Sequence, residues 1–120
     1  MREPSEALCF QTALQIAHLI ATRQTTSRAV TQYFLERIAC SSALNSFTVV
    51  FAEQALAAAD AADRALDTGH PLSPLHGVPV AIKDNIEIAN TLASAGSLSR
   101  LTTISAGTLD ALPHNGTVLM

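Results

Sequence analysis

An alanine-rich stretch, residues 52–67, constrains the fold of this 120-residue chain more than any other feature. Alanine has the highest helix propensity, and Ala55 and Ala59 begin a row of apolar residues that recurs at helical spacing. Gly69 and then Pro71 follow, in the order in which helices commonly end. The sequence therefore predicts a helix over residues 52–67.

The same stretch predicts a thin core. Hydrophobic residues make up 48% of the chain, but tryptophan is absent and the aromatic residues are four Phe and one Tyr. Alanine buries little area, and burial stabilises a fold by about 25 cal/mol per Å². We expect marginal stability. On the solvent side of the helix, Asp60 and Arg64 have the spacing of an i,i+4 ion pair.

Two further helices are predicted nearer the N-terminus. Thr12 and Gln15 form a capping-box pattern before an apolar stripe, which predicts a helix over residues 12–22. Thr26 and the serine after it offer a second N-cap, followed by apolar residues at helical spacing. This second helix is expected to end near Ala39.

Extended structure is predicted at two places. Residues 44–51 form a short run rich in β-branched and aromatic residues, which is either a strand or an extended link. Residues 71–79 contain three prolines and a glycine, so they read as turns. Because proline can begin a strand but not lie centrally in one, we expect a strand over residues 80–83. Its alternation would place Ala81 and Lys83 on the same face.

Composition and spacing exclude several classes of function. Seven Lys and Arg stand against ten Asp and Glu, and no basic cluster is interleaved with aromatic residues, so nucleic-acid binding is not supported. Cys9, Cys40 and the four histidines lack the spacing of metal ligands, so we expect no metal and no cofactor. No signal peptide and no apolar run of membrane-spanning length is present. The expected location is the cytoplasm, without membrane association.

Lys83 has three readings from its immediate surroundings. The plainest is a surface lysine at the end of a strand. A phosphate-binding loop needs a glycine directly before the lysine, where this chain has Ile82, so that motif is excluded. Residues 80–83 also spell the lysine motif of protein kinases, but no glycine-rich loop precedes it and no catalytic loop follows.

A longer string around the lysine carries a family resemblance. Residues 74–86, Pro-Leu-His-Gly-Val-Pro-Val-Ala-Ile-Lys-Asp-Asn-Ile, resemble the lysine-bearing segment of the amidase-signature family, which includes bacterial amidases, allophanate hydrolases and the A subunit of glutamyl-tRNA amidotransferase. Collinear segments such as Thr26-Ser27-Arg28 and Ala62-Asp63-Arg64 extend the resemblance over roughly residues 12–97. It implies an α/β fold, a mixed sheet covered by helices, of which this mostly helical chain would supply the N-terminal helices and first strand.

The resemblance also implies a mechanism. In this family a serine attacks an amide carbonyl, a second serine on a cis peptide bond relays its proton, and a lysine accepts it. Lys83 is the catalytic residue that carries over, whereas both serines would lie outside this chain. A lysine can be a base only when burial favours its neutral form, so the resemblance implies a buried Lys83. Asp84 is expected to point away from it.

Residues after 97 depart from the pattern. Ser97 matches a family serine that is not the nucleophile, and we expect a structural role for it; Ser105 is expected to form a turn. Residues 1–97 are therefore interpreted as the N-terminal part of an amidase domain, and residues 98–120 as a divergent, poorly ordered tail. A reading-frame change with a premature stop would produce this pattern.

The resulting hypothesis is a fragment of an amidase-type hydrolase of carboxamide C–N bonds, inactive by itself. The alternative is a non-catalytic helical fragment or interaction module. The partner of the full-length relative would be a small amide substrate. A lone strand would leave an unpaired sheet edge through which copies could associate.

Overall fold

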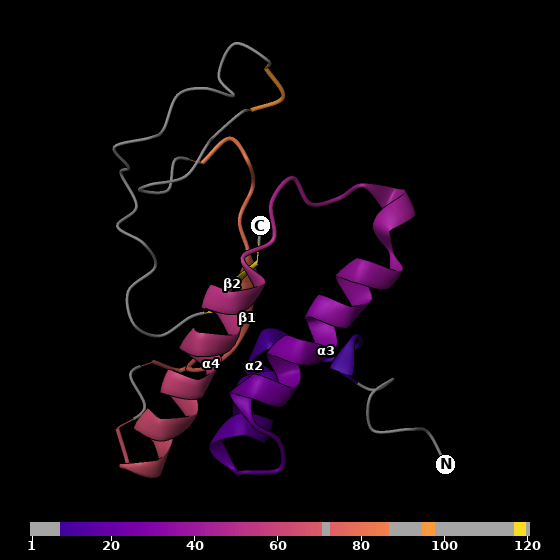
Figure 1. The fold of residues 1–120 in the computed structure, drawn as a ribbon. Coiled ribbons are helices and arrows are strands. Elements are labelled where there is room, and N and C mark those ends of the chain that lie inside the picture. Colours follow the sequence, from indigo (N-terminus) through magenta and orange to yellow (C-terminus); the bar gives the residue numbers. More distant parts are fainter. Residues whose placement is uncertain (1–7, 71–72, 87–94, 98–116, 120) are drawn as a thin grey trace.

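The computed structural model of the chain describes residues 8–70, 73–86 and 95–97 and the backbone of residues 117–119 (Figure 1). Within these ranges, helices come first along the chain and two short strands follow. The elements are α2 (Ala13–Ala21), α3 (Ser27–Cys40), the 3₁₀ turn η1 (Ser42–Leu44), α4 (Ala52–Asp67), β1 (Pro79–Ala81) and β2 (Thr117–Leu119).

The first predicted helix is confirmed as α2, together with its capping box. The Gln15 amide donates to the Thr12 side-chain oxygen at 3.2 Å, and the Thr12 amide donates to the Gln15 side-chain oxygen at 2.8 Å. These two bonds satisfy donors that the first turn of a helix leaves without partners. Ile16 and Ile20 are buried, whereas Leu14 remains 65% exposed on the other face.

The second predicted helix is confirmed as α3. The Thr26 hydroxyl accepts a hydrogen bond from the Ala29 amide at 3.1 Å and so caps the helix, which continues to Cys40. Of the two alternatives for residues 44–51, the structure shows the extended link: η1 ends in a left-handed Asn45, with φ of 50°, and no strand forms between it and α4.

The alanine helix is α4, with the predicted bounds. Ala55, Ala59 and Ala62 are buried, as the apolar spacing indicates. The expected pairing within the helix is replaced by one between helices, because Asp60 accepts a hydrogen bond from Arg28 of α3 at 2.6 Å. Both side chains are more than a third exposed, so this ion pair adds little stability.

The two strands pair in parallel, which corrects the expectation of a lone strand. Val80 lies opposite Val118, and β1 spans Pro79–Ala81 rather than residues 80–83. Residues 117–119 belong to the segment predicted to be poorly ordered, yet they form β2. Residues 98–116 of that segment lie outside the described residues. A helical N-terminal region and a strand-forming end together confirm the α/β class.

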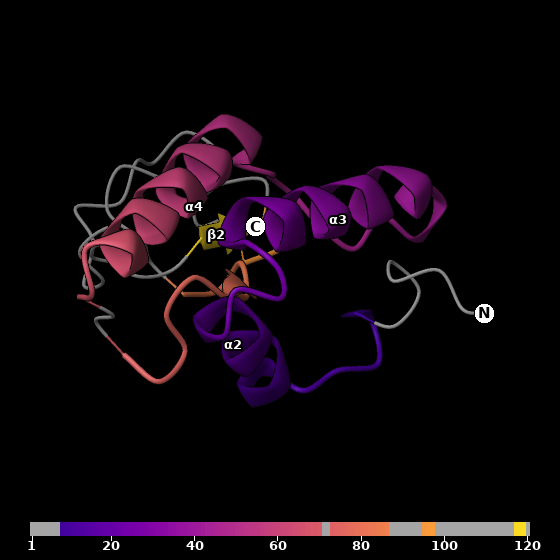
Figure 2. The same cartoon turned by 90° about the horizontal axis from the view of Figure 1, so that it is seen from below.

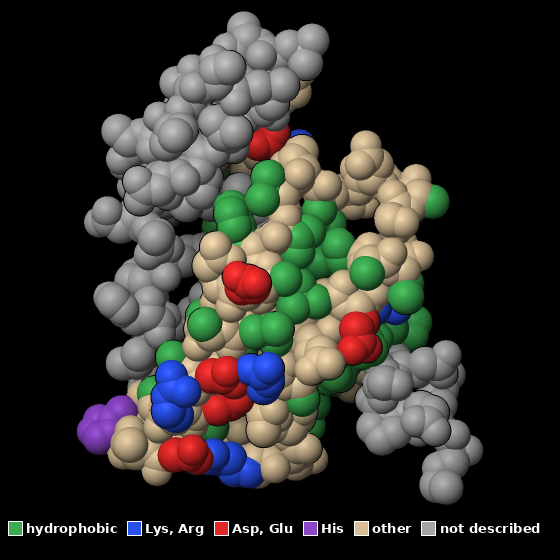
Figure 3. All heavy atoms as spheres, viewed as in Figure 1, with side chains coloured by type: hydrophobic (Ala, Val, Ile, Leu, Met, Phe, Trp, Pro, Cys, Tyr) green, Lys and Arg blue, Asp and Glu red, His purple; other side chains and the backbone are tan. Residues whose placement is uncertain are grey.

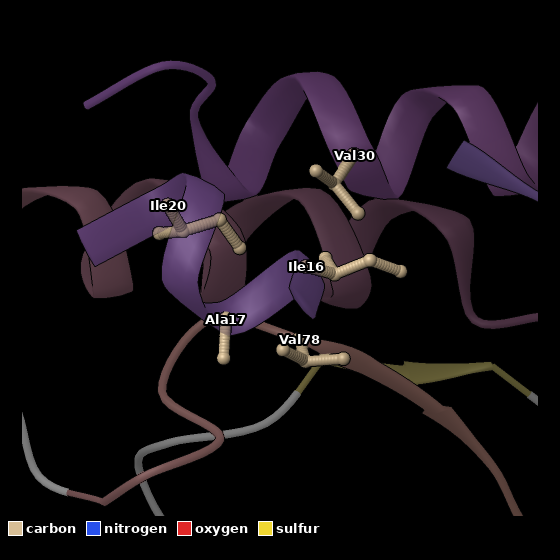
Figure 4. Packing of buried hydrophobic residues seen from close by; sticks show 5 residues of the cluster. All are labelled: Ile16, Ala17, Ile20, Val30 and Val78. Carbon is tan, nitrogen blue, oxygen red and sulfur yellow. The ribbon is translucent and has the colours of Figure 1, made fainter. Parts of the chain in front are cut away.

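The core lies where the helices meet the start of β1. Figure 2 shows α3 and α4 side by side on one side of the strands and α2 on the other. The buried cluster contains side chains from α2, α3 and the residue before β1 (Figure 4). Its members are few and aliphatic, with no aromatic ring among them: Ile16, Ala17, Ile20, Val30 and Val78. Such a core is consistent with the thin one that the composition predicts.

Candidate functional site

Lys83 lies two residues beyond the end of β1. Its backbone carbonyl accepts a hydrogen bond from the Ile86 amide at 3.0 Å, which closes a turn, and its side chain is exposed. Because β1 and β2 are parallel, the turn lies at the carboxyl edge of the pair. Open α/β sheets bind their ligands at this edge.

Two expectations about the lysine need correction. The strand ends at Ala81, so Asp84 lies in the turn and not in an extended segment. Val80 and Ile82 are half-buried while Ala81 and Lys83 are exposed, so burial alternates as expected, although Ile82 and Lys83 lie beyond the end of β1. The burial expected for a lysine that acts as a base is not found, because Lys83 is exposed.

A buried serine fixes the turn that leads into β1. Ser27 is 0% exposed, and its hydroxyl donates to the Gly77 carbonyl at 2.6 Å. Gly77 has a positive φ of 81°, and a Cβ there would lie 3.0 Å from the Ser27 Cβ. The close approach therefore needs both the hydroxyl and the missing side chain.

Asp63 of α4 binds the other side of the same serine. Its two carboxylate oxygens accept hydrogen bonds from the backbone amides of Ser27, at 2.8 Å, and Arg28, at 3.1 Å. These amides belong to the first turn of α3, where helices have free donors and partial positive charge. A carboxylate from one helix thus caps another and fixes the two against each other.

His76 adds a third bond to this junction. Its side chain is 5% exposed, and its Nε2 lies 2.8 Å from the Ala62 carbonyl oxygen. A carbonyl oxygen only accepts, so Nε2 carries the hydrogen. The Ser27 junction, as we name the contacts of Ser27, Asp63, His76 and Gly77, thus joins α3, α4 and the turn six residues before Lys83.

Sequence reasoning did not find this junction. Its bonds join residues that are 14 to 50 positions apart in the sequence, and no local spacing reports such contacts. The signals present were local ones: a serine at an N-cap, and a glycine and histidine within a turn-rich stretch. A local signal marked each of these residues, but nothing in the sequence indicated which residue it contacts.

Other titratable and polar groups lie away from this junction. The hydrogen bond to Cys9 raises the pKa of the Tyr33 phenol, burial adds to this, and Arg37 acts in the opposite direction. Ser97 is half-buried and follows two residues with positive φ, Ala95 and Gly96. Its expected structural role stays a prediction.

The described ranges hold neither a metal-type cluster nor a membrane-spanning helix. Within them, no three His, Cys, Asp or Glu side chains are placed to share a metal ion. None of the helices there has the length and apolar character that crossing a bilayer requires.

Comparison with known proteins identifies the family. The sequence model of the family named Amidase matches residues 29–118. This range covers three quarters of the chain and includes Lys83. The chain belongs to the amidase family. The match also extends past residue 97, where the resemblance in the residues was expected to end.

Curated amidase-family proteins show the same relationship. The chain is 47% identical over 83 residues to the A subunit of glutamyl-tRNA(Gln) amidotransferase from Corynebacterium diphtheriae, covering 68% of this chain and 17% of that protein. It is 41% identical over 86 residues to mandelamide hydrolase of Pseudomonas putida, covering 72% of this chain and 17% of the hydrolase. The chain therefore spans about a sixth of the length of these relatives.

Solved structures agree on the fold. A protein complex described in connection with the origins of an s-triazine catabolic enzyme superposes with a TM-score of 0.80 at 30% identity, over 91% of this chain and 25% of that one. A bacterial aryl acylamidase of the amidase-signature family gives a TM-score of 0.77 over 91% of this chain and 24% of that one. At 21% identity, the second likeness shows the fold alone.

The glycine of the Ser27 junction should be sensitive to any side chain. We expect Gly77→Ala to destabilise the chain by about 3 kcal/mol, because strain at positive φ adds to a clash with Ser27. Gly69→Ala is the control: its φ is 74°, but nothing lies within 4 Å of an added Cβ, so about 1 kcal/mol is expected. Urea unfolding measures both. Equal losses would contradict the close approach to Ser27.

The cap supplied by Asp63 should matter more than a surface ion pair. Asp63→Ala leaves two backbone donors of α3 without their acceptor, and we expect it to cost about 1–2 kcal/mol. Asp67→Ala, in the same helix, removes an exposed pair with Arg23 and should cost about 0.5 kcal/mol or less. Urea midpoints compare the two variants, and a larger effect at Asp67 would refute the capping role.

Proposed function

We propose that this chain supplies the lysine-bearing part of an amidase that hydrolyses carboxamide C–N bonds, with Lys83 as the base. The observation that carries the proposal is the family match over residues 29–118, which includes this lysine. The position of Lys83 at the carboxyl edge of parallel strands supports it, because that edge is where such sheets bind ligands. The substrate class is a small carboxamide, as the name mandelamide hydrolase indicates for one relative.

We further propose that the 120-residue chain does not hydrolyse amides alone. A lysine accepts a proton only as the neutral amine, and removal from water favours that form. Lys83 is exposed in this chain, so its use as a base requires a covering from elsewhere. The two serines that the family resemblance implies would come from the same additional part of the enzyme that covers Lys83. Residues 1–97 then act as the N-terminal portion of an amidase domain.

An interaction module is the second candidate. Phe10 is 85% exposed, Leu44 75% and Leu14 65%, and large apolar side chains in water favour association with another surface. Both candidates assume that the chain descends from an amidase. They differ in whether the chain takes part in catalysis. It requires that the chain bind a partner without contributing Lys83 to chemistry.

The isolated chain should not hydrolyse amides. We expect the release of ammonia from benzamide by the purified chain to equal that by its Lys83→Ala variant and by buffer. The reason is that, without the two serines, no nucleophile is present to attack the amide carbonyl. Turnover that Lys83→Ala abolished would contradict this.

Lys83 should be essential once the segment is inside a complete enzyme. In a chimera, the 86-residue region of mandelamide hydrolase that matches this chain is replaced by the corresponding segment of this chain. We expect the chimera to hydrolyse mandelamide and Lys83→Ala to lower its kcat/KM by at least about 100-fold, the usual contribution of a general base.

The matched control in this chimera is Arg64→Ala. Arg64 is an exposed residue of α4, so its loss should change kcat/KM by less than about threefold. A folded chimera without activity would refute the proposed function. So would a Lys83→Ala chimera as active as the unsubstituted one.

A further inference from the structure

An open groove runs along β1 on the side of α3. It has a volume of about 590 Å³ and lies between the C-terminal half of α3, the link after η1, and β1, all three of whose residues line it. Its larger apolar side chains come from the helix and the link: Phe34, Ile38, Phe47 and Val50. We call this hollow the α3–β1 groove.

The lining of the groove is suited to an apolar occupant. Most of its side chains are apolar, and Arg37 is the one charged residue among the described residues that line it. Figure 3, which has the orientation of Figure 1, shows hydrophobic side chains gathered between α3 and α4. An occupant that covered the groove would also take Arg37 out of water, and a desolvated guanidinium needs an acceptor.

The sheet itself indicates that something covers this side. Parallel strands occur almost only where both faces of a sheet are packed against other elements. β1 pairs in parallel with β2, yet the groove leaves β1 in contact with solvent on this side. Val50 is 37% exposed at the groove, so the link does not close it.

Comparison with the solved structures points to the occupant. This chain superposes over 91% of its length but accounts for 25% of the neighbouring chain. Three quarters of that chain therefore lie outside the part that this chain resembles. Since β1 lines the groove and Lys83 lies two residues beyond β1, a covering of the groove would also approach the lysine.

We propose that the α3–β1 groove is the docking surface for the remainder of an amidase fold, and that its occupant is an apolar segment of that remainder with an acceptor group facing Arg37. The inference rests on the proposed function, because it names the part of the protein that would cover the site. It holds whether the remainder belongs to the same polypeptide or to another.

Two neighbouring valines provide a matched test. Val49 and Val50 are 39% and 37% exposed, but only Val50 lines the groove. In the mandelamide hydrolase chimera, Val50→Arg should lower the melting temperature by at least about 5 °C, because it places a charge against the occupant. Val49→Arg should lower it by less than about 2 °C. In the 120-residue chain, where the groove is open, both variants should melt within about 2 °C of the unsubstituted protein.

Equal effects of the two variants in the chimera would overturn the proposal, whatever the activity. If the chimera shows no cooperative melt, the 120-residue chain is titrated with the part of mandelamide hydrolase outside the matched region. Binding weakened at least tenfold by Val50→Arg and unchanged by Val49→Arg then supports the proposal. No binding by the unsubstituted chain overturns it. So does dimerisation of the chain that Val50→Arg alone abolishes, since the occupant would be a second copy.

The experiments can reject the proposed function and the proposed docking surface independently of each other. It is tested by kcat/KM and Lys83→Ala, whereas the groove is tested by stability and binding. An active chimera that depends on Lys83 but tolerates Val50→Arg would keep the function and remove the docking surface. A chimera destabilised only by Val50→Arg but inactive would do the reverse.

Discussion

The hydrogen bond from the buried Ser27 hydroxyl to the Gly77 carbonyl is the contact on which the arrangement of this chain depends. Ser27 is held at the same time by Asp63, so one residue links the start of α3, the C-terminal half of α4 and the turn before β1. Hydrogen bonds to buried groups are costly to leave unmade. In a core with few side chains, such bonds fix the register of the elements where packing alone would specify it weakly.

The position of the candidate catalytic residue follows from this junction. Gly77 and Val78 are held against the helices, β1 begins at the next residue, and Lys83 emerges at the carboxyl edge of the strand pair. The lysine is thus placed by the helical layer but not covered by it. The exposed lysine and the open, mostly apolar groove lie along the same strand, and the proposed docking surface rests on this arrangement.

Membership of the amidase family gives this arrangement its chemical meaning. The family match covers most of the chain, while the chain covers 17% of the curated relatives in length. The activity of the full-length enzymes is therefore only proposed for this chain, which would supply one part of such an enzyme. That part is a scaffold that holds one lysine at a strand end and presents an apolar surface beside it.

The sequence by itself determined the helices and the family. The helix signals act within a few residues: the cap at Thr12, the spacing of the alanines and the glycine after α4. The residues around Lys83 are specific for the family without any knowledge of the fold. Only the tertiary structure decided that the strand has a parallel partner, that Asp60 bonds to α3, and that the lysine is exposed. Each of these depends on residues far apart in the chain, whose meeting is set by packing, for which a local pattern carries no signal.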